Sequence, residues 1–284
     1  MKLASLRLFT LVAALLWSAE AFAQSRPLVT EDPETVGPGQ VLLEAGVDYA
    51  QDMFYPLSGL RGQLWRVGTF GLSFGVSSIA EIQLDGGFRD YFTIANRLGG
   101  PLDFMMDFDG DRTSDFQDAT IGAKVRFLSE TESRPAMAVR FFTRLPNAGN
   151  ESGLGLDTTD FNFGLAIGKT VQSVRVVGNF GFGILADPVR GDRQNDVLNY
   201  GVSVARAVKS GVEMVGEING RLNTRPAGTE PIGTDSRSMF RLGTRITHGS
   251  VRGDAAFMAG ITERDPTWGF TVGMTWVFKA FTVH

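Results

Sequence analysis

The sequence predicts an all-β protein, namely a transmembrane, antiparallel, up-and-down β-barrel of about twelve strands. Three observations lead to this prediction: an N-terminal export signal, repeated alternation of apolar with small or polar residues, and connections that alternate between short and long. The composition agrees, because 35 Gly and 22 Phe favour closely packed strands. The absence of Cys excludes disulfides and thiolate metal sites.

Residues 1–23 have the three parts of a secretory signal peptide. Lys2 and Arg7 precede an apolar stretch, Leu8 to Trp17, and Ala21-Phe22-Ala23 forms a small-x-small cleavage site. The apolar stretch is shorter than the roughly 20 residues that a membrane-spanning helix needs. We therefore predict export, with cleavage after Ala23.

Residues 24–39 contain several prolines and show no alternation. We expect this segment either to fold into the barrel lumen as a small plug or to form a loose periplasmic tail. The barrel itself is expected to occupy residues 40–284.

Twelve segments after Gly39 alternate with period two, which is the pattern of β-strands. Their lengths suit tilted strands that cross a membrane, for which about 9–11 residues suffice. In order, the expected strands are residues 40–52, 62–75, 81–92, 116–128, 135–145, 158–170, 174–186, 197–208, 211–223, 237–247, 251–262 and 267–278.

One strand departs from the simple alternation. In residues 62–75, Trp65 and Val67 fall on one parity, whereas Phe70, Leu72 and Phe74 fall on the other. An extra residue in one strand of a pair restores alternation. We therefore expect a β-bulge near Gly68.

The connections between these segments alternate in length. Short connections fall at 77–80, 171–173, 209–210 and 248–250, and long ones at 93–115, 146–157, 187–196 and 224–236. Outer-membrane barrels have short periplasmic turns and long extracellular loops. An even number of strands then leaves both chain ends on the periplasmic side.

Charged residues decide which face of each strand is wet. In residues 237–247, Arg237, Arg241 and Arg245 share one parity, opposite Phe240 and Leu242. Twelve closed strands enclose more space than side chains can fill, and an Arg facing lipid near the midplane costs about 2–4 kcal/mol. The charged face is therefore expected to line a water-filled lumen. The apolar face, which on the last strand runs from Trp268 to Phe278, is expected to face lipid.

The same parity rule gives the expected pore lining. The residues are Glu44, Asp48, Glu81, Asp85, Arg89, Asp118, Lys124, Arg126, Arg140, Arg144, Glu213, Glu217, Arg221, Arg237, Arg241, Arg245, Arg252 and Asp254. They either select solutes or form cross-strand ion pairs, and the two interpretations are compatible. Their mixed signs argue against strong cation or anion selectivity.

Two stretches resemble a known family. "SRPLVTEDPETVGPGQVLLEAGVDY" and "SDFQDATIGAKVRFL", the latter followed by "RFFTRLPNAGNESGLGLDTTDF", are similar to motifs of the phenol-degradation meta-pathway family of outer-membrane transporters. Gln117 stands where the family usually has Gly, and residues 147–149 are one residue longer than its spacing. The resemblance implies an outer-membrane channel or transporter for small solutes, with aromatic compounds among them.

The loop 93–115 is rich in Asp between residues 103 and 115. "DFDGD" has many oxygen ligands of the kind that Ca²⁺ binds, but it lacks the spacing and the closing Glu of a calcium loop. A solvated acidic loop is the preferred interpretation. Phe104, Met105 and Met106 either constrict the lumen or pack on the barrel rim, and the rim is preferred.

Catalysis has little support in the sequence. The only histidines are His248, in a predicted periplasmic turn, and His284, at the terminus. A Ser-His hydrolase would need a His beside a Ser on the outer rim. We therefore expect no enzymatic activity, no catalytic residues, no metal and no cofactor.

The sequence thus predicts a bacterial outer-membrane channel through which small solutes diffuse. The alternative is a non-conducting barrel with a structural or surface-interaction role. The expected partners are outer-membrane lipids, a small-molecule solute and the barrel-assembly machinery, for which Phe278 or Phe281 supplies the terminal aromatic residue. A net charge of −4 makes nucleic acid an unfavourable partner.

Overall fold

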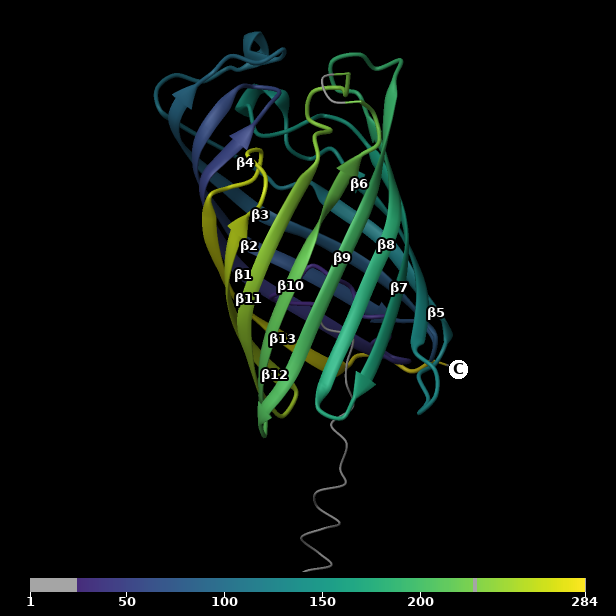
Figure 1. Ribbon diagram of the computed structural model, residues 1–284. Helices are drawn as coiled ribbons and strands as arrows, with labels where there is room; N and C mark the ends of the chain where they lie inside the picture. Colours follow the sequence, from purple (N-terminus) through teal and green to yellow (C-terminus); the bar gives the residue numbers. More distant parts are fainter. Residues whose placement is uncertain (1–24, 227–228, 284) are drawn as a thin grey trace, which may run out of the picture.

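The computed structural model describes residues 25–226 and 229–283 (Figure 1). The predicted signal peptide, residues 1–23, lies outside the described residues. Twelve long strands form the wall: β1 Gln40–Tyr55, β2 Leu60–Gly75, β3 Ala80–Arg97, β5 Ala119–Leu128, β6 Ala136–Leu145, β7 Asp160–Val171, β8 Val174–Ala186, β9 Gln194–Lys209, β10 Val212–Asn223, β11 Arg237–His248, β12 Val251–Gly260 and β13 Trp268–Lys279. Each corresponds to one predicted strand.

The remaining elements are short. Strand β4, Arg112–Asp115, pairs with the outer end of β3, and the 3-10 turns η1, Asp103–Met105, and η2, Asn150–Ser152, lie in loops. In the described part of the chain, no helix is long and apolar enough to span a membrane.

The sheet closes on itself, as predicted. All its pairs are antiparallel, and the first long strand pairs with the last, from Gln40 opposite Lys279 to Gln51 opposite Trp268. Strands β2 and β3 complete the ring. Figure 1 shows the tilted strands, with the short turns at one end and the long loops at the other. Closure pairs both edges of each of the twelve long strands described, and only the short β4 keeps a free edge.

The two faces of the wall differ as the alternation predicted. On β13, Val272 and Trp276 are 52% and 40% exposed, whereas Thr271 and Thr275 are buried. Outward-facing apolar residues recur on the other strands, for example Phe180 on β8 and Val202 on β9. A continuous apolar exterior is the surface that lipid covers.

The predicted β-bulge is confirmed at Gly68. The pairing of β1 with β2 shifts by one residue between Gly46 and Val47, and Gly68, with φ of 70°, is the extra residue. The bulge puts Trp65 on the outer face, where its ring lies 4.8 Å from that of Tyr49. It also turns Arg66 toward the lumen, opposite Asp48.

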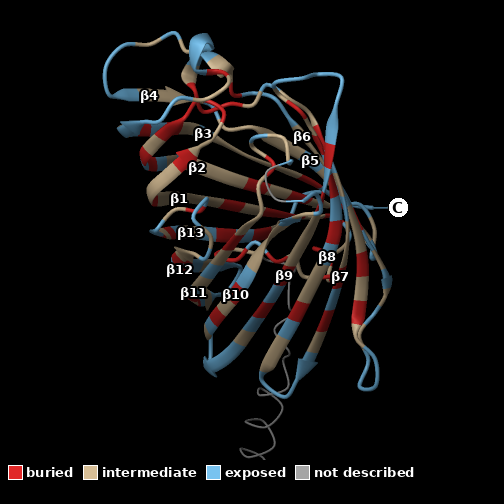
Figure 2. Ribbon diagram, turned by 45° about the horizontal axis from the view of Figure 1, so that its top comes forward, coloured by how far each residue is buried: buried red, intermediate tan, exposed pale blue. Residues whose placement is uncertain are grey.

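Loops cover the end of the barrel opposite the short turns. Leu57, in the turn between β1 and β2, is buried, and its side chain packs against Gly233 of the loop 224–236. Met106 packs against an apolar cluster that includes Leu60 and Phe92, whereas Phe104 is 78% exposed. Buried residues therefore also gather at the loop end, as seen from above in Figure 2.

Candidate functional site in the barrel lumen

Residues 25–39, hereafter the N-terminal segment, lie inside the barrel (Figure 1). Residues 25–36 contact the inner face of every long strand. The wall residues in contact are Glu44, Thr69, Glu81, Lys124, Arg140, Gly168, Asn179, Gly201, Glu217, Arg245, Asp254 and Thr271. The segment thus crosses the lumen and contacts the whole circumference of the wall in the half near the short turns.

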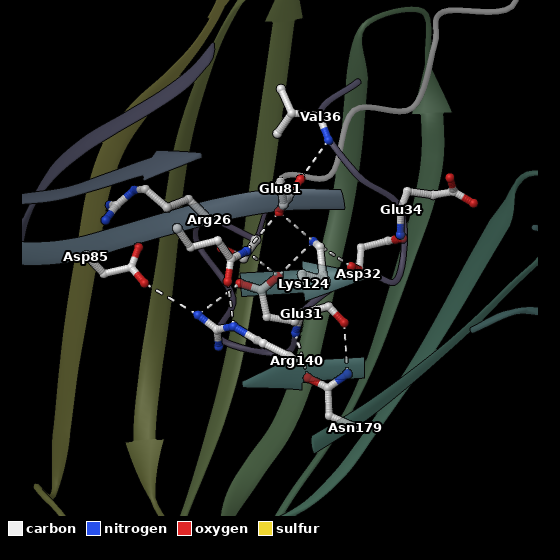
Figure 3. Close-up of polar contacts among 12 residues, drawn as sticks. Arg26, Glu31, Asp32, Glu34, Val36, Glu81, Asp85, Lys124, Arg140 and Asn179 are labelled. Carbon is white, nitrogen blue, oxygen red and sulfur yellow. Dashed lines mark hydrogen bonds and ion pairs between the residues drawn. The ribbon is translucent and has the colours of Figure 1, made fainter. Parts of the chain in front are cut away.

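An acidic stretch of the segment faces a basic patch of the wall (Figure 3). The Glu31 carboxylate lies 3.1 Å from Lys124 Nζ and 3.6 Å from a nitrogen of Arg140. Lys124, which is fully buried, also lies 3.0 Å from Glu81. Charges this deep must be paired, because an unpaired buried charge costs several kcal/mol.

The neighbouring acids of the segment are paired as well. Asp32 accepts two hydrogen bonds from Arg175, at 2.6 and 2.9 Å. Glu34 is paired with Arg126 at the base of β5. The two hydrogen bonds between Arg175 and Asp32 form the bidentate arrangement that gives Arg–carboxylate pairs their geometric specificity.

The opposite end of the segment reverses the charges. Arg26 donates to the Thr271 hydroxyl at 2.8 Å and lies 3.4 Å from Asp254. The Arg26 carbonyl in turn accepts a hydrogen bond of 2.8 Å from Arg245 Nε. Segment and wall are therefore complementary in charge at both ends.

Wall side chains also satisfy the backbone of the segment. Glu217 accepts from the amides of Val29 and Thr30, each at 2.8 Å. Asn179 accepts from the Glu31 amide at 2.7 Å and donates to its carbonyl at 2.8 Å. These contacts replace the hydrogen bonds that the segment would otherwise make to water.

Two glycines of the wall make room for the segment. A Cβ at Gly201 would lie 2.8 Å from Thr30 Oγ1, and one at Gly168 would lie 2.9 Å from the Pro33 ring. Both positions face the lumen, on β9 and β7. Close approach of another chain segment explains why these two positions lack a side chain.

Pairing changes the acidity of Glu31. Burial by itself would raise the pKa of this carboxyl, but the charges of Lys124 and Arg140 and hydrogen bonds from Lys124 and Gln83 lower it to about 2. Glu31 is therefore a carboxylate at neutral pH, and its charge contributes to holding the segment in place.

The structure places the predicted lining residues on the inner face, with Arg89 as the exception. Several are paired with one another across strands: Asp85 lies 3.4 Å from Arg140, Glu217 lies 2.8 Å from Arg241, and Glu213 lies 3.8 Å from Arg245. Arg144 bridges Asp118 and Asp160. Much of the wall charge is thus neutralised in pairs.

The prediction for Arg89 is wrong. Arg89 lies directly opposite Val67, which faces outward, and beside the exposed Tyr91. Its guanidinium lies 5.2 Å from the ring centre of Phe116. The inner face of β3 shifts from Asp85 to the even-numbered Asp90, next to the β2 bulge, so parity counted from the start of the strand fails beyond this point.

Three recesses that share lining residues lie between the loop end and the N-terminal segment. The first, about 580 Å³, lies along residues 260–267. The second, about 390 Å³ and hereafter the arginine chamber, shares Asp265 and Pro266 with the first. The third, about 230 Å³, shares Asn199 and Asn219 with the chamber and ends at residues 29–31.

Residues 24–278 match the family described as "Putative MetA-pathway of phenol degradation". The chain belongs to this family. Among solved structures it is similar to the COG4313 outer membrane channel from Pseudomonas putida F1, at 13% identity and a TM-score of 0.61, over 87% of this chain and 98% of that chain.

Two further structures have the same kind of fold. The NanC porin is 6% identical with a TM-score of 0.53, over 83% of this chain and 98% of that chain. The translocator domain of the autotransporter NalP from Neisseria meningitidis is 11% identical with a TM-score of 0.51, over 98% and 95%. No curated protein matches the sequence.

This family member is an outer-membrane β-barrel with the architecture of a channel. The resemblance seen in the sequence motifs and the predicted barrel of twelve long strands are both confirmed. The apolar exterior and the charged interior agree with this location.

Some inward-facing residues of this outer-membrane barrel escaped the sequence analysis. Arg66 and Asp90, 3.5 Å apart, were hidden by the irregularity of β2 and β3. Asn162 and Asn199, which share a hydrogen bond of 2.9 Å, lie on the inner face of β7 and β9. Their parity could have identified the asparagines, had neutral amides been considered beside the charges.

Gly201→Val is expected to displace the N-terminal segment, because the new side chain would occupy the place of Thr30. We expect a cysteine introduced at Thr30, in a chain that otherwise has none, to become reactive toward a polar maleimide. Gly178→Val is the matched control, since a Cβ there meets nothing within 4 Å. If the Thr30→Cys protein is labelled equally with Gly201→Val, with Gly178→Val and with neither change, the tight fit of Thr30 against Gly201 is contradicted.

Proposed function

We propose that the protein is an outer-membrane channel for small solutes, and that the N-terminal segment closes it on the periplasmic side. In this proposal the segment is a plug, and the channel conducts when the plug leaves its site. The predicted inward-facing charged residues, Arg89 excepted, line the path.

The series of three recesses carries this proposal. A barrel with a purely structural role needs no internal space, yet three recesses with shared lining residues lie between the loops and residues 29–31. The plug is held mainly by ion pairs and hydrogen bonds, which water can replace when the segment leaves. Leu28 and Val36 of the segment are also buried, and this smaller apolar surface becomes exposed to water when the segment leaves.

The solute class follows from size, polarity and family. Recesses of about 230 and 390 Å³ suit small organic molecules and not polymers. Because the family is described by phenol degradation, we include aromatic compounds among the solutes.

A reversible lock tests the proposal. A Cβ at position 201 would lie 2.8 Å from Thr30 Oγ1. The double variant Thr30→Cys, Gly201→Cys therefore brings two sulfurs close enough to form a disulfide. Thr30 Oγ1 is buried without a hydrogen-bond partner, so the change removes no hydrogen bond. We expect the oxidised protein to be silent in planar bilayers and to show discrete openings after reduction.

A truncation gives an independent result. The mature protein without residues 25–36 should conduct continuously. Residues 25–36 carry one positive and three negative charges, a net of −2. The reversal potential of the truncated protein in a salt gradient should therefore indicate greater anion selectivity than that of the full mature protein. Silence of both the reduced and the truncated protein would overturn the proposal in favour of a non-conducting barrel.

A further inference from the structure

We propose that the arginine chamber is a binding site for an organic monocarboxylate with a small apolar body. The proposal rests on the proposed channel function, because it names the class of solute that the path would admit. It is carried by four arginines that reach the chamber from three strands, and by methionines that line part of it.

Two of these arginines face each other without an acidic partner. Arg221 on β10 and Arg237 on β11 are directly opposite in the register. Like charges in this position repel each other. Among the described residues, neither guanidinium has a carboxylate within ion-pair distance. The arrangement is unfavourable by itself and becomes favourable when an anion lies between the two.

The existing partners of the pair leave donors free. Arg221 donates to the carbonyls of Asp235 and Gly233, at 2.9 and 2.7 Å. Arg237 has one long hydrogen bond of 3.5 Å, to the Phe54 carbonyl, and its Nε is buried without any partner. A carboxylate accepts two parallel hydrogen bonds from a guanidinium. Arg237 lacks such a carboxylate partner.

Two acids line the chamber, Asp265 and Asp48, and Asp48 lies directly opposite Arg66 in the register. Asp265 accepts from the Ser238 amide at 2.9 Å and from the Thr262 hydroxyl at 2.7 Å. The other two arginines of the chamber have acidic partners, since Arg66 lies 3.5 Å from Asp90 and Arg241 lies 2.8 Å from Glu217. The excess positive charge is therefore concentrated at Arg221 and Arg237.

The remaining wall explains why the ligand needs an apolar body. Met239 and Met258, which lie on the inner face of β11 and β12, line the same chamber, and Met258 is buried. Methionine adapts its shape and packs favourably against aromatic rings. With a volume of about 390 Å³, the chamber suits a carboxylate of the size of benzoate.

The test is calorimetric titration of the mature protein in detergent with benzoate, and with benzamide as its neutral counterpart. We expect one benzoate per chain, and weaker binding of benzamide by about tenfold or more. Arg221→Gln and Arg237→Gln should each weaken benzoate binding at least as much. Arg190→Gln, which changes an exposed loop arginine, should have no effect.

Arg237→Lys keeps the charge but loses the two parallel hydrogen bonds, and should bind benzoate with intermediate affinity. It also provides a test if Arg237→Gln fails to fold. Absence of benzoate binding, equal binding of benzamide, or unchanged binding by the folded Gln and Lys variants would each overturn this proposal. Because binding is measured without conduction, a silent protein that binds benzoate would overturn the channel proposal alone.

Discussion

Lys124→Met is expected to release the N-terminal segment and open the channel. Lys124 is fully buried between Glu31 and Glu81, at 3.1 and 3.0 Å. Without the ammonium, the Glu31 carboxylate faces the fully buried carboxylate of Glu81 with no cation between them. Removing one partner of a buried ion pair costs about 3–5 kcal/mol, and undocking of the segment relieves that cost by returning Glu31 to solvent.

The measurement combines conductance with labelling of a cysteine at Thr30 by a polar maleimide. We expect Lys124→Met to conduct like the protein without residues 25–36 and to label fully. Lys209→Met, at the exposed end of β9, should behave like the unchanged protein.

A triple variant separates release of the segment from misfolding of the barrel. Adding Glu31→Gln and Glu81→Gln to Lys124→Met removes both stranded charges and keeps the acceptor that Glu81 offers to the Val36 amide at 2.7 Å. We expect it to return toward the closed state. If Lys124→Met alone stays closed and unlabelled, the Lys124 ion pairs do not hold the segment.

The fold was predictable because its signals are local. Alternation with period two, loop lengths and the parity break between Trp65 and Phe70 are all readable within a few residues, and they located every long strand and the Gly68 bulge. Four-residue β4 has no such signal. It forms because the long loop after β3 folds back on that strand, which is a tertiary effect.

The candidate site was predictable in kind and not in detail. Parity identified the inward-facing charges until β3 shifted, where Arg89 was misplaced and Asp90 missed. Which acid meets which base was out of reach, because Glu31 and Lys124 are 93 residues apart in the chain. The N-terminal segment has no periodicity of its own, since its hydrogen bonds go to side chains of the wall and not to a sheet.

Acidification is expected to open the channel through Glu31. The pKa of this carboxyl is about 2 when the segment is docked, against an ordinary value of 4.5 when it is not. A lowered pKa means that the contribution of Glu31 to docking is complete above pH 4.5 and is lost as the pH falls toward 2. The docking equilibrium should weaken by about two powers of ten over this range.

Conductance recorded between pH 6 and pH 2.5 measures the effect. Glu31→Gln should remove most of the pH dependence, whereas Glu132→Gln, in an exposed turn, should leave it intact. The oxidised protein with cysteines at Thr30 and Gly201 is the decisive control, because acid titrates its lumen carboxylates without freeing the segment. Opening of that locked protein at low pH would mean that acid acts on the wall, whereas opening only after reduction would assign the pH response to Glu31 and its partners Lys124 and Arg140.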